Sequence, residues 1–486
     1  MAEIRFGTDG WRAVIAEDFT FDNVRICAQA VADYVKARGL ADRGMIIGYD
    51  TRFHSENFGA AVAEVFAGNG IVAYLATEAI PTPTTSYNIL HRKAAGGIII
   101  TASHNPPIYS GFKYRPEYAG AASPEITAEV ERRLCAVQTG ACAVKRLALP
   151  EARTKGLIVD LDAKTPYLAQ MARLVDVDAI RSADLTVVVD SMFGAGMGYF
   201  PALLSGGKIR IIEINNQRNP LFPGMNNPEP IAHNLRALVK GVAAHRADIG
   251  IANDGDADRI GVVDEKGNFI NQLQVYALLM LYLLEVRQQR GPIIKTVTST
   301  IMADKLAKMY NIPVYETQVG FKYVGPKMLE VNAIMGGEES GGYAFAGNVP
   351  ERDGILAGLY LLDFMVKTGK TPSQLIEHLY SLVGPHYYER WDISFPPEKR
   401  GEIVEKVRGE QPTRVAGLKV IKTDTVDGFR YWLEDGGWLL IRFSGTEPII
   451  RVYVETTHQD KVEQILCGGV ELAGLSDELA AQRGHA

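Results

Sequence analysis

Three aspartates at alternate positions offer the clearest chemistry in this sequence. Asp254, Asp256 and Asp258 lie in the segment Asp-Gly-Asp-Ala-Asp-Arg, where only small residues separate them. An extended strand would place successive carboxylates roughly 6–7 Å apart, whereas glycine and alanine let the backbone curl so that the oxygens converge. Three hard oxygen ligands favour Mg²⁺, with further oxygens from substrate or protein. An acidic surface turn is the alternative that the segment alone leaves open.

The aspartate segment does not fit an EF-hand, although Glu265 falls at the position of that loop's twelfth ligand. Arg259 occupies the position where an EF-hand requires glycine, and strand-like residues flank the segment on both sides. We therefore exclude a calcium loop of this type.

A serine beside a histidine follows a short apolar segment at residues 97–101. Ser103 and His104 lie in Thr-Ala-Ser-His-Asn-Pro (101–106), and loops at the carboxyl ends of strands are where open α/β sheets bind ligands. The pair suggests a nucleophile with a proton acceptor, or a hydroxyl that carries phosphate. Turn formation before Pro106 is the structural alternative. The sequence around Ser103 has no GxSxG elbow, so a hydrolase triad is unsupported.

Two glycine-bearing segments carry groups that suit a phosphorylated sugar. Gly-Gly-Glu-Glu-Ser-Gly-Gly (336–342) offers two acids and a hydroxyl for sugar hydroxyls, and it contains no GxGxxG or Walker pattern. Arg-Phe-Ser-Gly-Thr-Glu-Pro (442–448), followed by Arg451, has the parts of a phosphate cradle. A flexible acidic loop and a hairpin with charged edges are the respective alternatives.

Further cations lie on glycine-bearing loops in Phe-Gly-Thr-Asp-Gly-Trp-Arg (6–12) and Gly-Phe-Lys (320–322). Taken singly, each is typical of a solvated surface. Together with the other segments they make up a metal site, a reactive serine, a polyol-binding loop and a phosphate clamp. A sugar phosphate held between domains would use all of them.

Alternating strands and helices position these segments over most of the chain. Apolar runs predict strands at 45–50, 71–75, 97–101, 185–190, 209–213, 248–252, 293–297, 314–316 and 331–335. Amphipathic or apolar stretches predict helices at 23–38, 56–69, 274–290 and 302–310, the third of them buried. This alternation favours parallel βαβ units. The last hundred residues instead predict an α+β module, with strands at 391–395, 418–422, 429–433, 438–443 and 451–455 and helices at 402–408 and 459–472.

Composition sets the outer limits on function. The chain has 486 residues, 47% hydrophobic and 22% charged, which excludes a disordered or fibrous protein. A formal charge of −6 argues against a nucleic-acid or membrane-surface partner. Four scattered cysteines, no signal-peptide pattern and no apolar run of about 20 residues predict a cytoplasmic protein.

The chain resembles the α-D-phosphohexomutase superfamily in five motifs, which occur in the family's order: FGTDGWR (6–12), TASHNP (101–106), DGDADR (254–259), GEESGG (337–342) and RFSGTEP (442–448). The resemblance implies three related α/β domains with mixed, mostly parallel sheets and a C-terminal α+β domain, arranged around a central cleft. We expect these domains at 1–150, 151–262, 263–383 and 384–486, with the phosphoserine, metal, sugar and phosphate loops in that order.

The resemblance also implies residue roles. Ser103 resembles the serine that carries the phosphoryl group and completes the Mg²⁺ site with the three aspartates. Glu338 and Ser340 resemble the pair that holds the sugar 3- and 4-hydroxyls. The residues that resemble the phosphate-binding loop are Arg442, Ser444, Gly445 and Thr446. Those expected close to the transferring group are Arg12, His104, Lys113, Arg259 and Lys322, with His104 and Lys322 as candidates for proton transfer.

The leading hypothesis is a phosphoglucomutase, an isomerase that interconverts glucose 1-phosphate and glucose 6-phosphate through phosphorylated Ser103. Glucose 1,6-bisphosphate would be both the intermediate and the activator. The GEES form of the sugar loop favours glucose over the GEMS form of dual-specificity members. The alternatives are a dual phosphomannomutase/phosphoglucomutase, a phosphoglucosamine mutase and a metal-dependent sugar phosphatase. We expect a hexose phosphate as the partner, and a monomer or homodimer.

Overall fold

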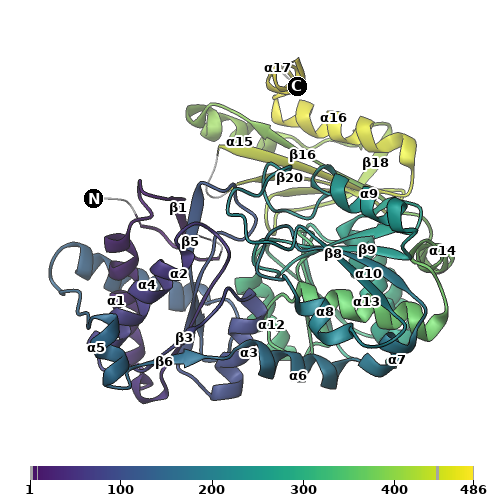
Figure 1. Ribbon diagram of the computed structural model, residues 1–486. Helices are drawn as coiled ribbons and strands as arrows, with labels where there is room; N and C mark the ends of the chain where they lie inside the picture. The colour runs from purple at the N-terminus through teal and green to yellow at the C-terminus, as the bar shows by residue number, and fades with distance from the viewer. Residues whose placement is uncertain (1–3, 8, 445–447, 485–486) are drawn as a thin grey trace.

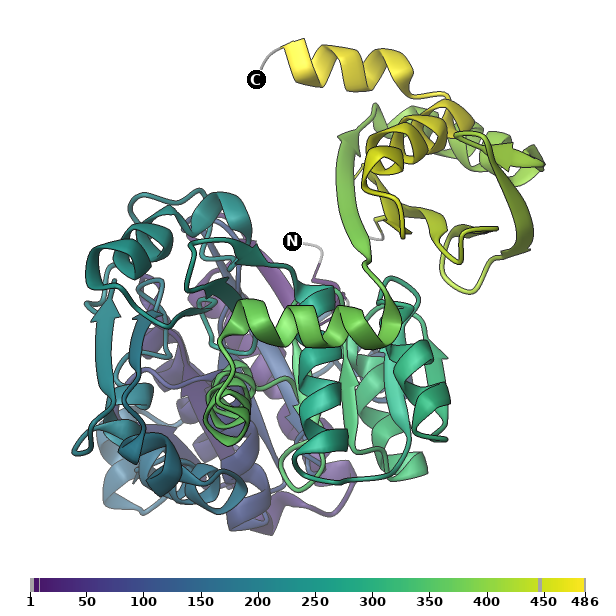
Figure 2. The ribbon, with the colours of Figure 1, turned by 90° about the vertical axis from the view of Figure 1, so that its right-hand side faces the viewer.

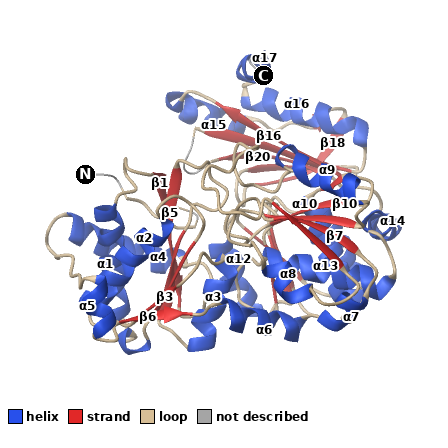
Figure 3. Ribbon diagram, in the orientation of Figure 1, coloured by secondary structure: helices blue, strands red, loops and turns tan. Residues whose placement is uncertain are grey.

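In the described part of the chain, four β-sheets follow one another (Figure 1). The computed structural model describes residues 4–7, 9–444 and 448–484. Helices flank the first three sheets, and an antiparallel sheet forms the C-terminal unit (Figure 3). The expected architecture of three mixed α/β units and an α+β unit is therefore confirmed.

The first sheet has six described strands, in the spatial order β1 (Trp11–Val14), β5 (Tyr109–Pro116), β4 (Gly96–Ile100), β2 (Met45–Tyr49), β3 (Ala73–Ala76) and β6 (Ile158–Leu161). The central strands run parallel, and the β4–β5 and β5–β1 pairs are antiparallel. The helices of this unit are α1 (Phe21–Ala37), α2 (Ser55–Gly68), α3 (Thr82–Arg92), α4 (Pro124–Gln138) and α5 (Leu149–Thr154). Every residue of β2 and β4 is buried, as expected for strands covered on both faces.

The second sheet has the described order β11 (Phe269–Ile270), β10 (Ile260–Asp264), β9 (Ile249–Asn253), β7 (Thr186–Asp190) and β8 (Arg210–Ile214). Its helices are α6 (Lys164–Leu174), α7 (Val177–Ser182), α8 (Tyr199–Leu204) and α9 (Arg236–His245). The expected boundary between the second and third domains, at residue 262, falls within the β10–β11 hairpin. The expected boundary between the first and second domains, at residue 150, lies before β6, although β6 belongs to the first sheet. The domain boundaries stay a prediction.

The third sheet has the described order β13 (Val314–Thr317), β12 (Ile293–Thr296), β14 (Met335–Gly337) and β15 (Tyr343–Phe345). Its helices are α10 (Gln272–Glu285), α11 (Met302–Met309), α12 (Phe321–Val331), α13 (Gly354–Thr368) and α14 (Pro372–Val383). The strand predicted at 331–335 is wrong except at Met335, because α12 extends through Val331 and Asn332 ends it in a left-handed conformation with φ 53°. Among the described residues, no helix combines the length and apolarity needed to span a bilayer.

The fourth sheet is wholly antiparallel and has its own apolar core. Its described order is β16 (Tyr387–Ser394), β21 (Ile449–Thr456), β20 (Trp438–Phe443), β19 (Phe429–Leu433), β18 (Leu418–Asp424) and β17 (Arg414–Val415). Its helices are α15 (Arg400–Gly409), α16 (Val462–Ala473) and α17 (Ser476–Gly484). Short 3-10 turns lie at Ala41–Arg43, Ala232–Asn234, Pro397–Lys399 and Gln459–Lys461.

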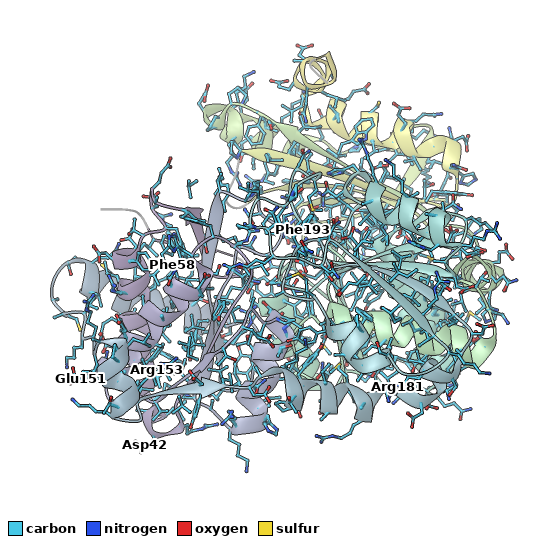
Figure 4. All side chains as sticks on the ribbon, in the orientation of Figure 1. Asp42, Phe58, Glu151, Arg153, Arg181 and Phe193 are labelled. Carbon is cyan, nitrogen blue, oxygen red and sulfur yellow. The ribbon has the colours of Figure 1, made fainter. Side chains whose placement is uncertain are left out.

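Buried polar contacts join the units. Figure 2 shows the chain leaving α14 into β16 of the C-terminal lobe. In that lobe the buried Glu455 carboxylate accepts hydrogen bonds from Thr300 Oγ1 (2.5 Å) and Ile301 N (2.8 Å) of the third unit. Thr51 Oγ1 of the first unit donates to the carbonyl of Phe193 at 2.7 Å, near the centre of the molecule (Figure 4).

The N-cap of α13 gives a stability prediction. Burial raises the pKa of Asp353 to about 6, although hydrogen bonds from Leu356 N, Tyr167 and Asn348 partly oppose the shift. Since the folded-state pKa lies above the ordinary value, ionisation costs stability, which falls as pH rises from about 4 to about 6. We expect Asp353→Asn to raise the free energy of unfolding at neutral pH by up to about 3 kcal/mol.

Thermal unfolding at several pH values tests this expectation. Asparagine keeps an acceptor for the helix N-terminus. Its amide can donate to Asn348 Oδ1, which is buried and has no partner in the part of the chain that the structure describes, once the Asn348 amide rotates. The advantage of the variant should therefore grow from about pH 4 to about pH 7. An advantage independent of pH would show that Asp353 is not the titrating group.

Candidate active site

The serine loop lies at the carboxyl end of β4 in a strained conformation. Ser103 is fully buried and has φ 52°, in the left-handed region that non-glycine residues rarely adopt. Its backbone N–H donates to Thr101 Oγ1 at 2.8 Å, which helps to hold the turn. His104 Nδ1 lies 3.3 Å from Ser103 Oγ. Burial, followed by the charges of Arg259 and Arg12, holds the pKa of His104 well below its ordinary value.

Arg52 holds the serine loop through its backbone carbonyls. Its Nη2 donates to Ser103 O (2.8 Å) and Asn105 O (2.6 Å), and its Nη1 donates to Pro106 O (2.8 Å) and Tyr109 O (2.9 Å). Its Nε lies 3.2 Å from the Asp50 carboxylate. The arginine thus ties the carboxyl end of β2 to that of β4. Sequence analysis missed it, although its place just after a buried strand was a usable signal.

We expect Arg52→Lys to lower turnover about 100-fold, because a lysine cannot reproduce the planar set of donors and small displacements of a reacting group are costly. Arg153→Lys, at an exposed arginine of the same unit (Figure 4), is the control and should leave the rate unchanged. The two variants are compared by steady-state kinetics with the expected hexose phosphate substrate. A thermal melt of each variant checks that it is folded. Equal rates for the two variants would show that the Arg52 hydrogen bonds do not position Ser103.

The aspartate loop and the serine loop meet, although 151 residues separate them in sequence. Ser103 Oγ donates to Asp254 Oδ2 at 2.9 Å. Asp254, Asp256 and Asp258 are fully buried, and one carboxylate oxygen of each lies within 4.8 Å of the others. Ala257 has φ 54°, which provides the curl expected between the carboxylates. The predicted convergence of these oxygens is therefore confirmed.

The electrostatics of the three aspartates fit a hard cation. Burial and the charges of Asp256 and Asp258 raise the pKa of Asp254 well above its ordinary value. Burial also opposes the charge on Asp256, but Lys113 and a hydrogen bond from Thr82 outweigh it and lower the pKa of Asp256. Among the described residues, none donates a hydrogen bond to the buried Asp256 Oδ1 or Asp258 Oδ1. Such oxygens are suitable ligands for a divalent cation.

Two predicted cations, Lys113 and Arg259, lie against this loop. Lys113 Nζ is 2.9 Å from Asp256 Oδ2 and 3.6 Å from Asp258 Oδ2. Burial opposes its charge, but Asp256 and Asp9 outweigh that effect and raise the pKa of Lys113. The Arg259 backbone N–H donates to Asp254 Oδ1 at 3.0 Å, and its Nη1 donates to Glu229 at 3.0 Å. Arg259 Nε lies 3.9 Å from Asp258 Oδ1, so both side chains lie beside the aspartates.

Arg12 and a second set of buried charges complete this side of the site. Arg12 Nη1 donates to Asn105 Oδ1 in the serine loop. Arg352 Nη2 lies 2.7 Å from Asp258 Oδ2 and donates to Asp9 Oδ2 at 2.9 Å. Arg115 joins Asp9 to Glu351 through contacts of 2.8 and 2.5 Å. Sequence analysis missed Arg352 and Arg115, although three consecutive charged residues (351–353) before an apolar helix marked the first.

The sugar loop connects β14 to β15 and lies beside the cations. Burial raises the pKa of Glu338, and its Oε1 accepts a hydrogen bond from Gly320 N at 2.8 Å. Glu338 Oε2 lies 3.6 Å from Arg352 Nη1. Ser340 Oγ is buried and has no hydrogen-bond partner among the described residues, so it is free to bind a ligand hydroxyl. The structure thus brings the 320–322 and 336–342 segments together.

The remaining predicted residues lie toward the C-terminal lobe. Arg442, at the end of β20, pairs with Asp427 at 3.0 Å, and the same carboxylate accepts from Val319 N at 2.9 Å. Ser444 is buried, and its N–H donates to Ile449 O at 2.9 Å. Lys322 Nζ lies 5.3 Å from the Tyr323 ring centroid, and no described carboxylate pairs with it. Gly445 and Thr446 lie outside the described residues.

Comparison with known proteins places these features in one family. Profiles of the phosphoglucomutase/phosphomannomutase family match the chain over residues 3–140 (α/β/α domain I), 165–267 (domain II), 271–383 (domain III) and 402–466 (C-terminal domain). The crystal structure described as a "putative phosphomannomutase" from Thermus thermophilus superposes with a TM-score of 0.84 at 33% identity. That comparison covers 97% of this chain and 99% of the other.

Curated relatives cover nearly the whole chain and carry three different names. "Phosphoglucomutase/phosphomannomutase" of Thermococcus kodakarensis is 33% identical, over 96% of this chain and 98% of its own. "Phosphoglucomutase" of Komagataeibacter xylinus is 30% identical (93% and 87%), and "Probable phosphoglucosamine mutase" of Methanothermobacter thermautotrophicus is 32% identical (95% of both). The chain therefore belongs to the phosphoglucomutase/phosphomannomutase family of the α-D-phosphohexomutase superfamily, whose members are phosphohexomutase enzymes.

Proposed function

We propose that this phosphohexomutase interconverts glucose 1-phosphate and glucose 6-phosphate, with Ser103 as the residue that carries the phosphoryl group. The observation that supports this proposal best is the contact of 2.9 Å between Ser103 Oγ and Asp254, inside a buried set of carboxylates and cations. A serine that only shaped a turn would need neither the buried aspartates nor the neighbouring cations.

The proposed reaction exchanges one phosphoryl group in each direction. Phosphorylated Ser103 gives its phosphoryl group to the free hydroxyl of a hexose monophosphate, which forms glucose 1,6-bisphosphate and frees the serine oxygen. After the bisphosphate turns over, its other phosphoryl group returns to Ser103. His104 and Lys322 are our candidates for taking the hydroxyl proton and returning it. Lys113, Arg12 and the Arg259 guanidinium offset charge on the transferring group.

The other motifs hold the two ends of the sugar phosphate. Glu338 and Ser340 present a carboxylate and a hydroxyl for sugar hydroxyls, and Arg442 with Ser444 to Thr446 binds the phosphate that is not being transferred. Asp254, Asp256 and Asp258, with an oxygen on Ser103, would hold Mg²⁺. The ion would neutralise phosphoryl oxygens.

Substrate comparison tests the proposal directly. Turnover of glucose, mannose and glucosamine 1-phosphates is measured with and without catalytic glucose 1,6-bisphosphate, and we expect glucose to be preferred and the bisphosphate to activate. Comparable rates on mannose would support the dual-specificity candidate, which the name of the Thermococcus relative favours. Release of inorganic phosphate without 6-phosphate would instead identify a phosphatase.

A further inference from the structure

Adjacent carboxylates of the sugar loop face different units. Glu338 accepts a hydrogen bond from Gly320 N within its own unit. Glu339 Oε1 instead accepts from Tyr388 Oη at 2.8 Å and from Arg390 Nη1 at 2.9 Å. Both donors lie on β16, in the C-terminal lobe. The Glu339 side chain is only 11% exposed, so these charge-assisted contacts are partly shielded from water.

Alternating charges continue from Glu339 toward the phosphate loop. Arg390 Nε lies 2.8 Å from Asp392 Oδ1, and Asp392 Oδ2 accepts from Arg451 Nε at 3.3 Å. In the antiparallel register, Asp392 is opposite Arg451 and Arg451 is opposite Arg442. The series Glu339–Arg390–Asp392–Arg451 therefore connects the loop that would hold sugar hydroxyls to the strands that would present the phosphate-binding residues.

The geometry of β16 limits how far the side chains between Glu339 and Asp392 can move relative to one another. Tyr388, Arg390 and Asp392 are alternate residues of β16, so they share one face of the strand. An isolated surface pair would contribute little. Here two donors from one strand converge on a single carboxylate oxygen, and the arginine is also held by a second acid.

We propose that Glu339 is a positioning residue, which acts through Arg390 to fix the distance between the sugar-binding and phosphate-binding loops. This inference rests on the proposed function for its kinetic consequences. A mutase must hold the hydroxyl face and the phosphate of one ligand together, so that distance sets how well both ends are bound. In this account Glu339 does not contact the sugar, because its contacts are with β16. The GEES form of the loop is then a marker of the glucose-preferring members and not itself a sugar contact.

Kinetics of Glu339→Gln, Arg390→Gln and the double variant test the proposal. Each single variant should raise KM for glucose 1-phosphate about tenfold with less than about a twofold change in kcat, since ground-state and transition-state binding are weakened together. The double variant should be no worse than the poorer single variant, because the residues act as one unit. Glu330→Gln, which removes the exposed pair with Lys327 on α12, is the matched control and should change nothing.

Hydrogen exchange of the full chain without substrate provides a readout independent of activity. Glu339→Gln should speed amide exchange in residues 338–342 and in β16, and Glu330→Gln should not. Unchanged exchange, or KM effects that add in the double variant, would overturn the proposal. A changed ratio of glucose to mannose turnover in Glu339→Met would also overturn the proposal, because it would show that residue 339 contributes to sugar selection. If no hexose phosphate were turned over at all, the proposed function would fail, and exchange would still decide the role of Glu339.

Discussion

Replacing Ser103 by alanine should reduce mutase turnover by at least about 10⁴-fold, because the proposed reaction has no other group to hold the phosphoryl between its two transfers. The backbone at this position should survive, since Arg52 holds it through the Ser103 carbonyl rather than the hydroxyl. The measurement is a coupled assay for glucose 6-phosphate formation. Mass spectrometry after incubation with glucose 1,6-bisphosphate should show one added phosphoryl group on the wild-type chain and none on the variant.

Ser86→Ala is the matched control for this experiment. Ser86 is also fully buried in the first unit, and its Oγ has no hydrogen-bond partner among the described residues. Its removal should leave both turnover and the phosphoryl adduct intact. Wild-type turnover in Ser103→Ala, or an adduct that persists in it, would contradict the role proposed for Ser103.

Removal of divalent cations should lower turnover at least about 10³-fold, and added Mg²⁺ should restore it, because a metal ion contributes several kcal/mol of charge stabilisation in such sites. Chelation should also lower the melting temperature, since an ion that binds only the folded chain stabilises it. Asp254→Asn should lose activity and the Mg²⁺-dependent shift together. Its melting temperature without metal should equal or exceed that of the wild type, because Asp254 is repelled by Asp256 and Asp258.

Asp248→Asn separates this effect from the general cost of losing a carboxylate. Asp248 lies just before β9 and accepts a hydrogen bond from Thr186 N at 2.7 Å, away from the three aspartates. The variant should keep its Mg²⁺ response. A wild-type melting temperature that is unaffected by chelation and by added Mg²⁺ would contradict a metal site at the aspartate loop.

Local pattern predicts most of the strands because their burial is nearly complete. Residues 45–49 are apolar and inaccessible on both faces, so an uninterrupted apolar run identifies the strand. The same rule fails at 331–335, where the end of a helix and the start of a strand lie within one short, mostly apolar segment. A run of that length has no period to separate the two structures, and only the left-handed Asn332 marks the boundary.

Whether a site residue could be predicted from the sequence depends on the contacts that its side chain makes. Three carboxylates between small residues mark the Asp254 segment, and a serine-histidine pair after an apolar segment marks the Ser103 segment. Arg52 donates hydrogen bonds to backbone carbonyls, and Arg352 contacts acids from distant segments. Neither arginine therefore belongs to a local sequence pattern. Their roles depend on which strand ends meet in space, and that is decided by sheet order.

The pairing of β6 with β3 decides how a separated N-terminal piece of this chain would behave. Residues 158–161 cover β3 on the side away from β2, in parallel register from Ala73 to Ala76. A fragment cut at residue 150 would leave the β3 backbone donors and acceptors open, and open strand edges recruit other chains. A fragment that extends past Leu161 would include β6, which pairs with the open edge of β3. Because β6 comes so far along the chain, we expect the shorter fragment to self-associate and the longer one to stay monomeric.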